Sequence, residues 1–134
     1  MRFLIAGILA AAVSWVGNRA MLRLLGTQVI VVMAPFIEET AKSGSAALVG
    51  SPLLLTHGIF GLIEGFYDAW NSGWQGMEAG IASLTGHLFF GYITYLVLTR
   101  HHIFWLAVLT GYTVHMLWNI TVMKFMVRKR RISS

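Results

Sequence analysis

Carboxylate and imidazole side chains occur in the most apolar parts of this sequence. Four of its five acidic residues lie inside or near the ends of apolar stretches, namely Glu38, Glu39, Glu64 and Asp68. The same stretches hold Lys42, His87, His115 and Asn119. An ionisable group near the centre of a membrane helix costs about 2.5–3.5 kcal/mol on insertion scales. Carboxylates and imidazoles carry out general acid–base chemistry and ligate metal ions, so these residues are candidates for a functional site.

The spacing of these residues indicates how they could converge. Residues four apart lie on one face of a helix, and Glu38 with Lys42 forms one such pair. His115 and Asn119 form another, with Gly111 one turn before them. Small residues on the same face let membrane helices approach closely. The spacing therefore predicts polar faces that are directed toward the interior of a helical bundle.

The acidic pair also has a structural interpretation. Glu38 and Lys42 could be an intrahelical ion pair that neutralises itself in lipid, whereas Glu39 has no lysine at the equivalent spacing. An isolated His87 inside a membrane helix is more often a packing or hydrogen-bonding residue than a catalyst. Histidine and asparagine can simply bond helices together, usually for about 1 kcal/mol or less.

Other ionisable residues lie close to the ends of the apolar stretches. His57, His101 and His102 are interpreted as interfacial for this reason. Asp68 is interpreted as an interfacial acid, with a partnership with Glu64 as the alternative.

The elements that must position these residues are predicted to be membrane-spanning helices. The sequence is 57 % hydrophobic and 11 % charged, and so few charges cannot cover a soluble domain of this size. Apolar stretches of about 20 residues suffice to cross the bilayer, and they are found at 3–22, 27–49, 53–70, 78–99 and 103–126. The predicted fold is therefore all-α, a polytopic bundle of about five transmembrane helices in a single domain, 1–134, with a turn-forming loop at 71–76.

The basic residues indicate a membrane surface rather than a nucleic acid. Half of the ten lysines and arginines lie between Lys124 and Arg131, where a short tail would contact anionic headgroups. The tail lacks the interleaved aromatic residues of a single-strand binder. The absence of cysteine excludes disulfides and thiolate chemistry.

Four short motifs follow one another along the chain: Glu38-Glu39-Thr40-Ala41-Lys42, Phe60-Gly61-Leu62-Ile63-Glu64, an isolated His87, and His115-Met116-Leu117-Trp118-Asn119. This order resembles the PrsW-type branch of the CAAX protease and bacteriocin-processing (CPBP) superfamily. The pattern of that branch is Glu-Glu-x-x-Lys, Phe-x-x-x-Glu, a histidine, and a final His-x-x-x-Asp or His-x-x-x-Asn, each on a different transmembrane helix. The resemblance covers about residues 34–120.

The resemblance implies a glutamic intramembrane protease that hydrolyses peptide bonds of membrane-protein substrates without a covalent intermediate. Glu38 or Glu39 would activate water with the help of a histidine, and Lys42 would hold the glutamate pair. His115 and Asn119 would polarise the scissile carbonyl or stabilise its oxyanion. No metal and no cofactor are expected.

The resemblance also bears on substrate and location. Glu64 replaces the histidine found at this motif in the CAAX-protease branch, so a prenylated substrate is not implied. The expected location is a prokaryotic cell membrane, crossed several times. The chain is close to the minimum needed for the motif helices, and a homo-oligomer could supply further elements.

Two other functions fit the same residues. The carboxylates and histidines could bind protons or a divalent cation in a membrane protein or transporter. Alternatively, the chain could be a non-catalytic membrane scaffold of the same fold.

Overall fold

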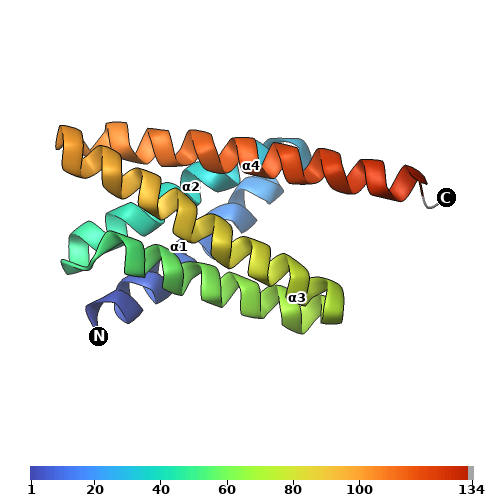
Figure 1. Cartoon of the computed structure of the whole chain (residues 1–134), viewed down its shortest axis with the longest axis horizontal. Coiled ribbons are helices and arrows are strands. Elements are labelled where there is room, and N and C mark those ends of the chain that lie inside the picture. The colour runs from blue at the N-terminus through green and yellow to red at the C-terminus, as the bar shows by residue number, and fades with distance from the viewer. Residues whose placement is uncertain (133–134) are drawn as a thin grey trace.

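The structure is a computed structural model that describes the backbone of residues 1–132, with all side chains in that range except those of 27–30, 73–75 and 125–132. Four helical elements follow in order: α1 (Arg2–Leu25), α2 (Thr27–Val49), α3 (Leu53–His101) and α4 (Phe104–Ile132) (Figure 1). Every regular element within the described range is a helix. The predicted all-α fold class is confirmed.

The longest element, α3, folds back on itself, as Figure 1 shows. A Cβ atom added to Gly65 would lie 2.8 Å from the main-chain oxygen of Gly80, and one added to Gly80 would lie 2.6 Å from that of Gly65. In a straight helix these residues would be about 22 Å apart. The two arms, 53–72 and Gly76–His101, thus pack against each other through glycines.

The reversal occurs where the sequence predicts a loop. The chain around 71–76 keeps helical backbone geometry while it changes direction, so the predicted helices 53–70 and 78–99 become the two arms of one element. Glycine at both contact positions is what allows this spacing, because any side chain there would meet the opposite backbone.

The connections between elements are tight. Gly50, with a φ of 65°, closes α2 in the left-handed conformation, and His102, with a φ of 56°, closes α3. In Figure 1 the N-terminus, the α2–α3 connection and the α3–α4 connection lie on the left, whereas the reversal of α3 and the C-terminus lie toward the right. Successive helical segments therefore run in opposite directions.

The polarity of the molecule is inverted relative to a soluble protein. The side chains of Glu39, Lys42 and His57 have no exposed surface, whereas Leu48 is 79 % exposed and Phe66 is 70 % exposed. Water would not favour this arrangement, but lipid solvates apolar side chains and forces polar ones inward.

Among the described residues, three helices are long and apolar enough to cross a membrane: Arg2–Leu25, Gly76–His101 and Phe104–Lys124. This is fewer than the five spans predicted. The other two segments, α2 and the arm 53–72, are not among them: α2 carries Glu38, Glu39 and Lys42, and the arm carries Glu64 and Asp68, and these ionisable residues lower the mean hydropathy. The basic tail that is predicted to contact headgroups begins at Lys124, which is exposed, and the rest of its side chains, from 125 onward, lie outside the described residues.

Candidate active site

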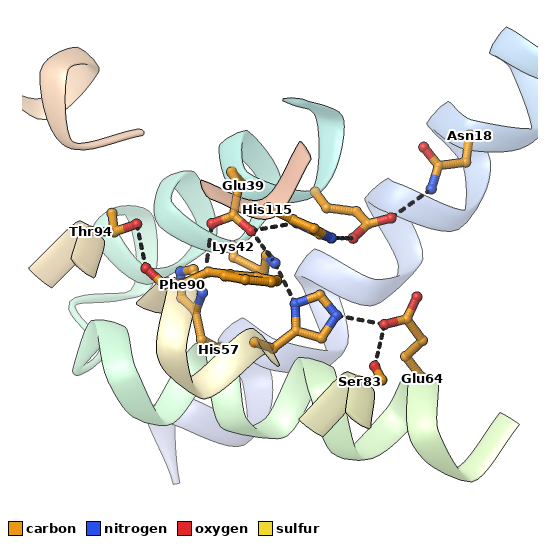
Figure 2. Close-up of polar contacts among 11 residues, drawn as sticks. Asn18, Glu39, Lys42, His57, Glu64, Ser83, Phe90, Thr94 and His115 are labelled. Atoms are coloured by element: carbon orange, nitrogen blue, oxygen red, sulfur yellow. Dashed lines mark hydrogen bonds and ion pairs between the residues drawn. The ribbon is translucent and has the colours of Figure 1, made fainter. Parts of the chain in front are cut away.

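Glu39 is the hub of a buried hydrogen-bond network, which Figure 2 shows. Its Oε1 accepts hydrogen bonds from Lys42 Nζ at 2.6 Å and from His115 Nδ1 at 2.9 Å. The lysine lies one turn further along α2, and the histidine lies on α4. Because all three side chains are buried, the carboxylate joins two helices without contact with solvent.

Lys42 extends the network to the two arms of α3. Its ammonium group lies 2.8 Å from His87 Nδ1 and 4.6 Å from the centre of the Phe60 ring, which covers it. An ammonium group only donates, so His87 Nδ1 accepts and the imidazole proton is on Nε2. That nitrogen donates to Glu64 Oε2 at 2.5 Å, and Ser83 Oγ donates to the same oxygen at 2.6 Å.

The orientation of His115 follows from the same reasoning. Its Nδ1 faces an acceptor, the carboxylate of Glu39, and therefore carries the proton. The Nε2 lone pair then points toward Glu38 Oε2, 3.9 Å away. This separation is too long for a direct hydrogen bond but suits a shared water molecule. Phe90 stacks on the imidazole with ring centres 4.4 Å apart and holds its plane.

The ion pair that the spacing of α2 suggests between Glu38 and Lys42 is not formed. Lys42 bonds to Glu39 instead, because the lysine is directed toward His87. Glu38 Oε1 accepts a hydrogen bond at 3.1 Å from the amide of Asn18 on α1. In the described part of the chain, no lysine or arginine pairs with Glu38, so this carboxylate, and not Glu39, is the uncompensated member of the pair.

A cavity of about 470 Å³ opens beside Glu38, between α1, α2 and the first arm of α3. Its polar lining residues are Ser14, Asn18, Glu38, Glu64 and Asp68, and the remainder of its lining consists of aliphatic, alanine and aromatic side chains. A volume of this size is typical of small-molecule sites. Two carboxylates of the network, Glu38 and Glu64, therefore share one cavity, which Asp68 also lines.

Six of the seven predicted site residues lie together in this arrangement: Glu38, Glu39, Lys42, Glu64, His87 and His115. Asn119 lies one turn beyond His115 on α4, is partly exposed, and makes no hydrogen bond to these residues within the described range.

The interfacial interpretation of His57 is wrong. This histidine is fully buried, and its Nδ1 lies 3.8 Å from Glu39 Oε2. The position of His57 near the start of a span suggested the membrane surface, but the two arms of α3 pack closely and cover it. A Cβ added to Gly91 would lie 2.7 Å from the Cβ of His57. His101 and His102 are exposed, and their interfacial position stays a prediction.

Sequence reasoning also missed two partners of the carboxylates. Asn18 lies at the end of an apolar run, beside Arg19, where a polar residue needs no special explanation. Ser83 belongs to a stripe of small residues and gave no sign of a hydrogen bond to Glu64. The only signal for either was polarity within a predicted span.

No protein-family profile, curated protein or solved structure matches this chain.

Proposed function

We propose that this protein is a multi-pass membrane protease that hydrolyses peptide bonds of membrane proteins by general base catalysis with glutamate and histidine. One observation carries the proposal: Glu38, which pairs with no lysine or arginine among the described residues, lines a cavity, and its Oε2 lies 3.9 Å from His115 Nε2. The order of the four motifs and their resemblance to the PrsW-type proteases supports the same function.

In the proposed reaction, a water molecule binds between Glu38 and His115 Nε2. The water attacks the scissile carbonyl carbon, and its proton passes to this pair and then to the nitrogen of the departing amine. Glu39 holds the Nδ1 proton of His115 and thereby keeps the lone pair of Nε2 on the reacting side, the same role that a carboxylate has in a hydrolytic triad.

The lysine and the second histidine serve the proposed reaction indirectly. Lys42 neutralises Glu39 and fixes His87, and His87 in turn orients Glu64 at the same cavity. A role for Asn119 in stabilising the oxyanion is proposed on the resemblance alone. Asn119→Ala is expected to slow cleavage without affecting the network around Glu39.

The proposed location is within the membrane. The apolar exterior and the three apolar helices support this location. We propose that α2 and the arm 53–72 also cross the bilayer, each once. The substrate would then be a membrane protein that approaches the cavity from within the bilayer. A prokaryotic cell membrane remains the expectation from the resemblance, and a homo-oligomer could supply further elements.

The proposal is tested with purified protein in liposomes together with an extract of membrane proteins. In water enriched in ¹⁸O, new peptide C-termini carrying the heavy isotope should appear, and Glu38→Gln and His115→Ala should abolish them. Glu78→Gln and His102→Ala, which change exposed residues of the same types, should retain cleavage. Cleavage by Glu38→Gln at the wild-type rate would exclude this mechanism.

One observation favours a second candidate, proton transfer across the membrane. Hydrogen bonds connect His115, Glu39, Lys42, His87 and Glu64 in a continuous path. Liposomes loaded with a pH-sensitive dye distinguish the two functions: proton flux that requires Glu64, without new peptide termini, would favour transport. Absence of both activities would favour the scaffold.

A further inference from the structure

The side chains of Glu38, His87 and His115 are spaced as ligands of a metal ion would be before the ion binds. Each offers one ligand atom, these atoms all lie within 4.8 Å of one another, and all three residues are buried. Zinc binds carboxylate oxygen and imidazole nitrogen at about 2.0–2.2 Å, so ligand atoms in a tetrahedral site are about 3.4 Å apart. The three side chains would have to move together by little more than about 1 Å.

His115 is already prepared as a ligand. Its Nδ1 donates to Glu39 Oε1 at 2.9 Å, and this bond leaves the Nε2 lone pair free on the side of Glu38. A histidine that binds metal typically donates its other N–H group to a carboxylate, which fixes the ring and increases the donor strength of the ligating nitrogen. Glu39 therefore occupies the position of an outer-shell partner.

The charge of the cluster favours a divalent cation. When Glu38, Glu39 and Glu64 are ionised, their three negative charges face the single positive charge of Lys42, which leaves two in excess. Excess charge in a buried site is costly. A divalent ion of the Zn²⁺ type would neutralise it, and imidazole and carboxylate ligands suit such an ion.

We infer that Glu38, His115 and His87 form an inhibitory binding site for a divalent transition-metal cation such as Zn²⁺. The binding is independent of the proposed function, whereas the inhibition rests on it. The cation would occupy the space between Glu38 and His115 Nε2 that the proposed mechanism gives to the reacting water. It would also break the network, because both nitrogens of His87 are engaged, with Lys42 and Glu64, until one is released to the metal.

Direct binding tests the site. Protein purified without a histidine tag is dialysed against Zn²⁺, and bound metal is measured by elemental analysis. One ion per chain is expected for the wild type and for the His101→Ala/His102→Ala variant, which removes the exposed histidine pair. Glu39→Gln should weaken binding by about 10–100-fold, the effect of losing an outer-shell partner. Glu38→Gln and His115→Ala should weaken it further.

Two results would overturn the site: wild-type protein that binds no zinc above background, or Glu38→Gln that binds it as tightly as the wild type. Because Glu38→Gln keeps the size of the side chain and the neutral partner Asn18, it should fold where the histidine variants fail. Its thermal stability is measured alongside to verify this.

Activity tests the inhibition separately. Stoichiometric Zn²⁺ should stop the release of ¹⁸O-labelled termini by the wild type, and a chelator should restore it. Full activity of the zinc-loaded protein would overturn the inhibitory role. Stoichiometric zinc binding by protein that cleaves no substrate, with or without chelator, would support the metal site and contradict the proposed protease.

Discussion

Lys42 Nζ lies 2.6 Å from Glu39 Oε1, and neither side chain has any exposed surface. A buried ion pair of this kind contributes little net stability over an apolar pair, but removal of one partner leaves an uncompensated charge in a low-dielectric interior. The pair also connects α2 to both α4 and α3 through the two histidines. It therefore determines the geometry of the candidate site.

Lys42→Met should lower the free energy of unfolding by about 3–5 kcal/mol, because Glu39 would remain charged and unpaired. Adding Glu39→Gln should recover part of the loss. Lys124→Met, at an exposed lysine, should change stability by less than about 0.5 kcal/mol. Unfolding in a graded detergent series measures the stability of the three variants. A double variant that is no more stable than Lys42→Met would contradict the explanation that the loss comes from the unpaired charge of Glu39.

Gly65→Ala should destabilise the protein, because the new methyl group would lie 2.8 Å from the main-chain oxygen of Gly80. The expected loss is about 1–3 kcal/mol, typical of overpacking. Gly44→Ala is the matched control, because no neighbouring helix has an atom within 4 Å of the added Cβ. Alanine has the better helix propensity, so the stability of this variant should be unchanged or higher by up to about 1 kcal/mol. Thermal unfolding in detergent measures both, and equal effects would argue against the close approach of the α3 arms.

Asn18→Ala should reduce the rate of cleavage, since the amide of Asn18 holds Glu38 Oε1 at 3.1 Å. Asn18 is a positioning residue, so the maximal rate should fall while the Michaelis constant for a cleaved peptide changes little. Asn71→Ala removes an exposed amide that bonds the main-chain oxygen of Tyr67 and should leave both parameters unchanged. If Asn18→Ala instead raised only the Michaelis constant, Asn18 would belong to substrate binding.

His57→Leu should be tolerated, because both ring nitrogens of His57 are buried and find no hydrogen-bond partner among the described residues. An apolar side chain removes this unsatisfied polarity, so the free energy of unfolding should stay within about 1 kcal/mol of the wild type or increase. His87→Leu should cost about 2 kcal/mol or more, since it removes the acceptor that faces Lys42 Nζ and the N–H donor to Glu64, while Lys42 keeps Glu39 and Glu64 keeps Ser83. A comparable loss for His57→Leu would indicate that its 3.8 Å approach to Glu39 Oε2 closes to a hydrogen bond.

Single cysteines can test the proposed membrane crossing by the arm 53–72 without background, since the chain has no cysteine of its own. Ser51→Cys and His102→Cys lie in connections at the same end of the bundle, and Ser72→Cys lies at the reversal of α3 (Figure 1). In intact cells, an impermeant thiol reagent should label either the first two or only the third. Labelling of Ser51→Cys and Ser72→Cys from the same side would exclude crossing by the arm 53–72, which lies between these positions.

The sequence by itself determined the all-α class and most of the residues that meet at the candidate site. Long apolar stretches leave few alternatives to helices, because backbone polar groups in lipid must be satisfied within the segment. The rarity of acids and histidines in such stretches marked Glu38, Glu39, Glu64, His87 and His115, whatever their partners.

Only the tertiary structure decided which of these residues bond to one another. The spacing along α2 favoured an ion pair between Lys42 and Glu38. The lysine side chain is long and flexible, however, and it is directed toward His87 on another helical segment, where it bonds to Glu39. The same packing buried His57 and brought Asn18 of α1 to Glu38. Periodicity reports which face of a helix is polar, whereas partners across helices depend on how closely the helices pack, which here depends on glycines such as Gly65 and Gly80.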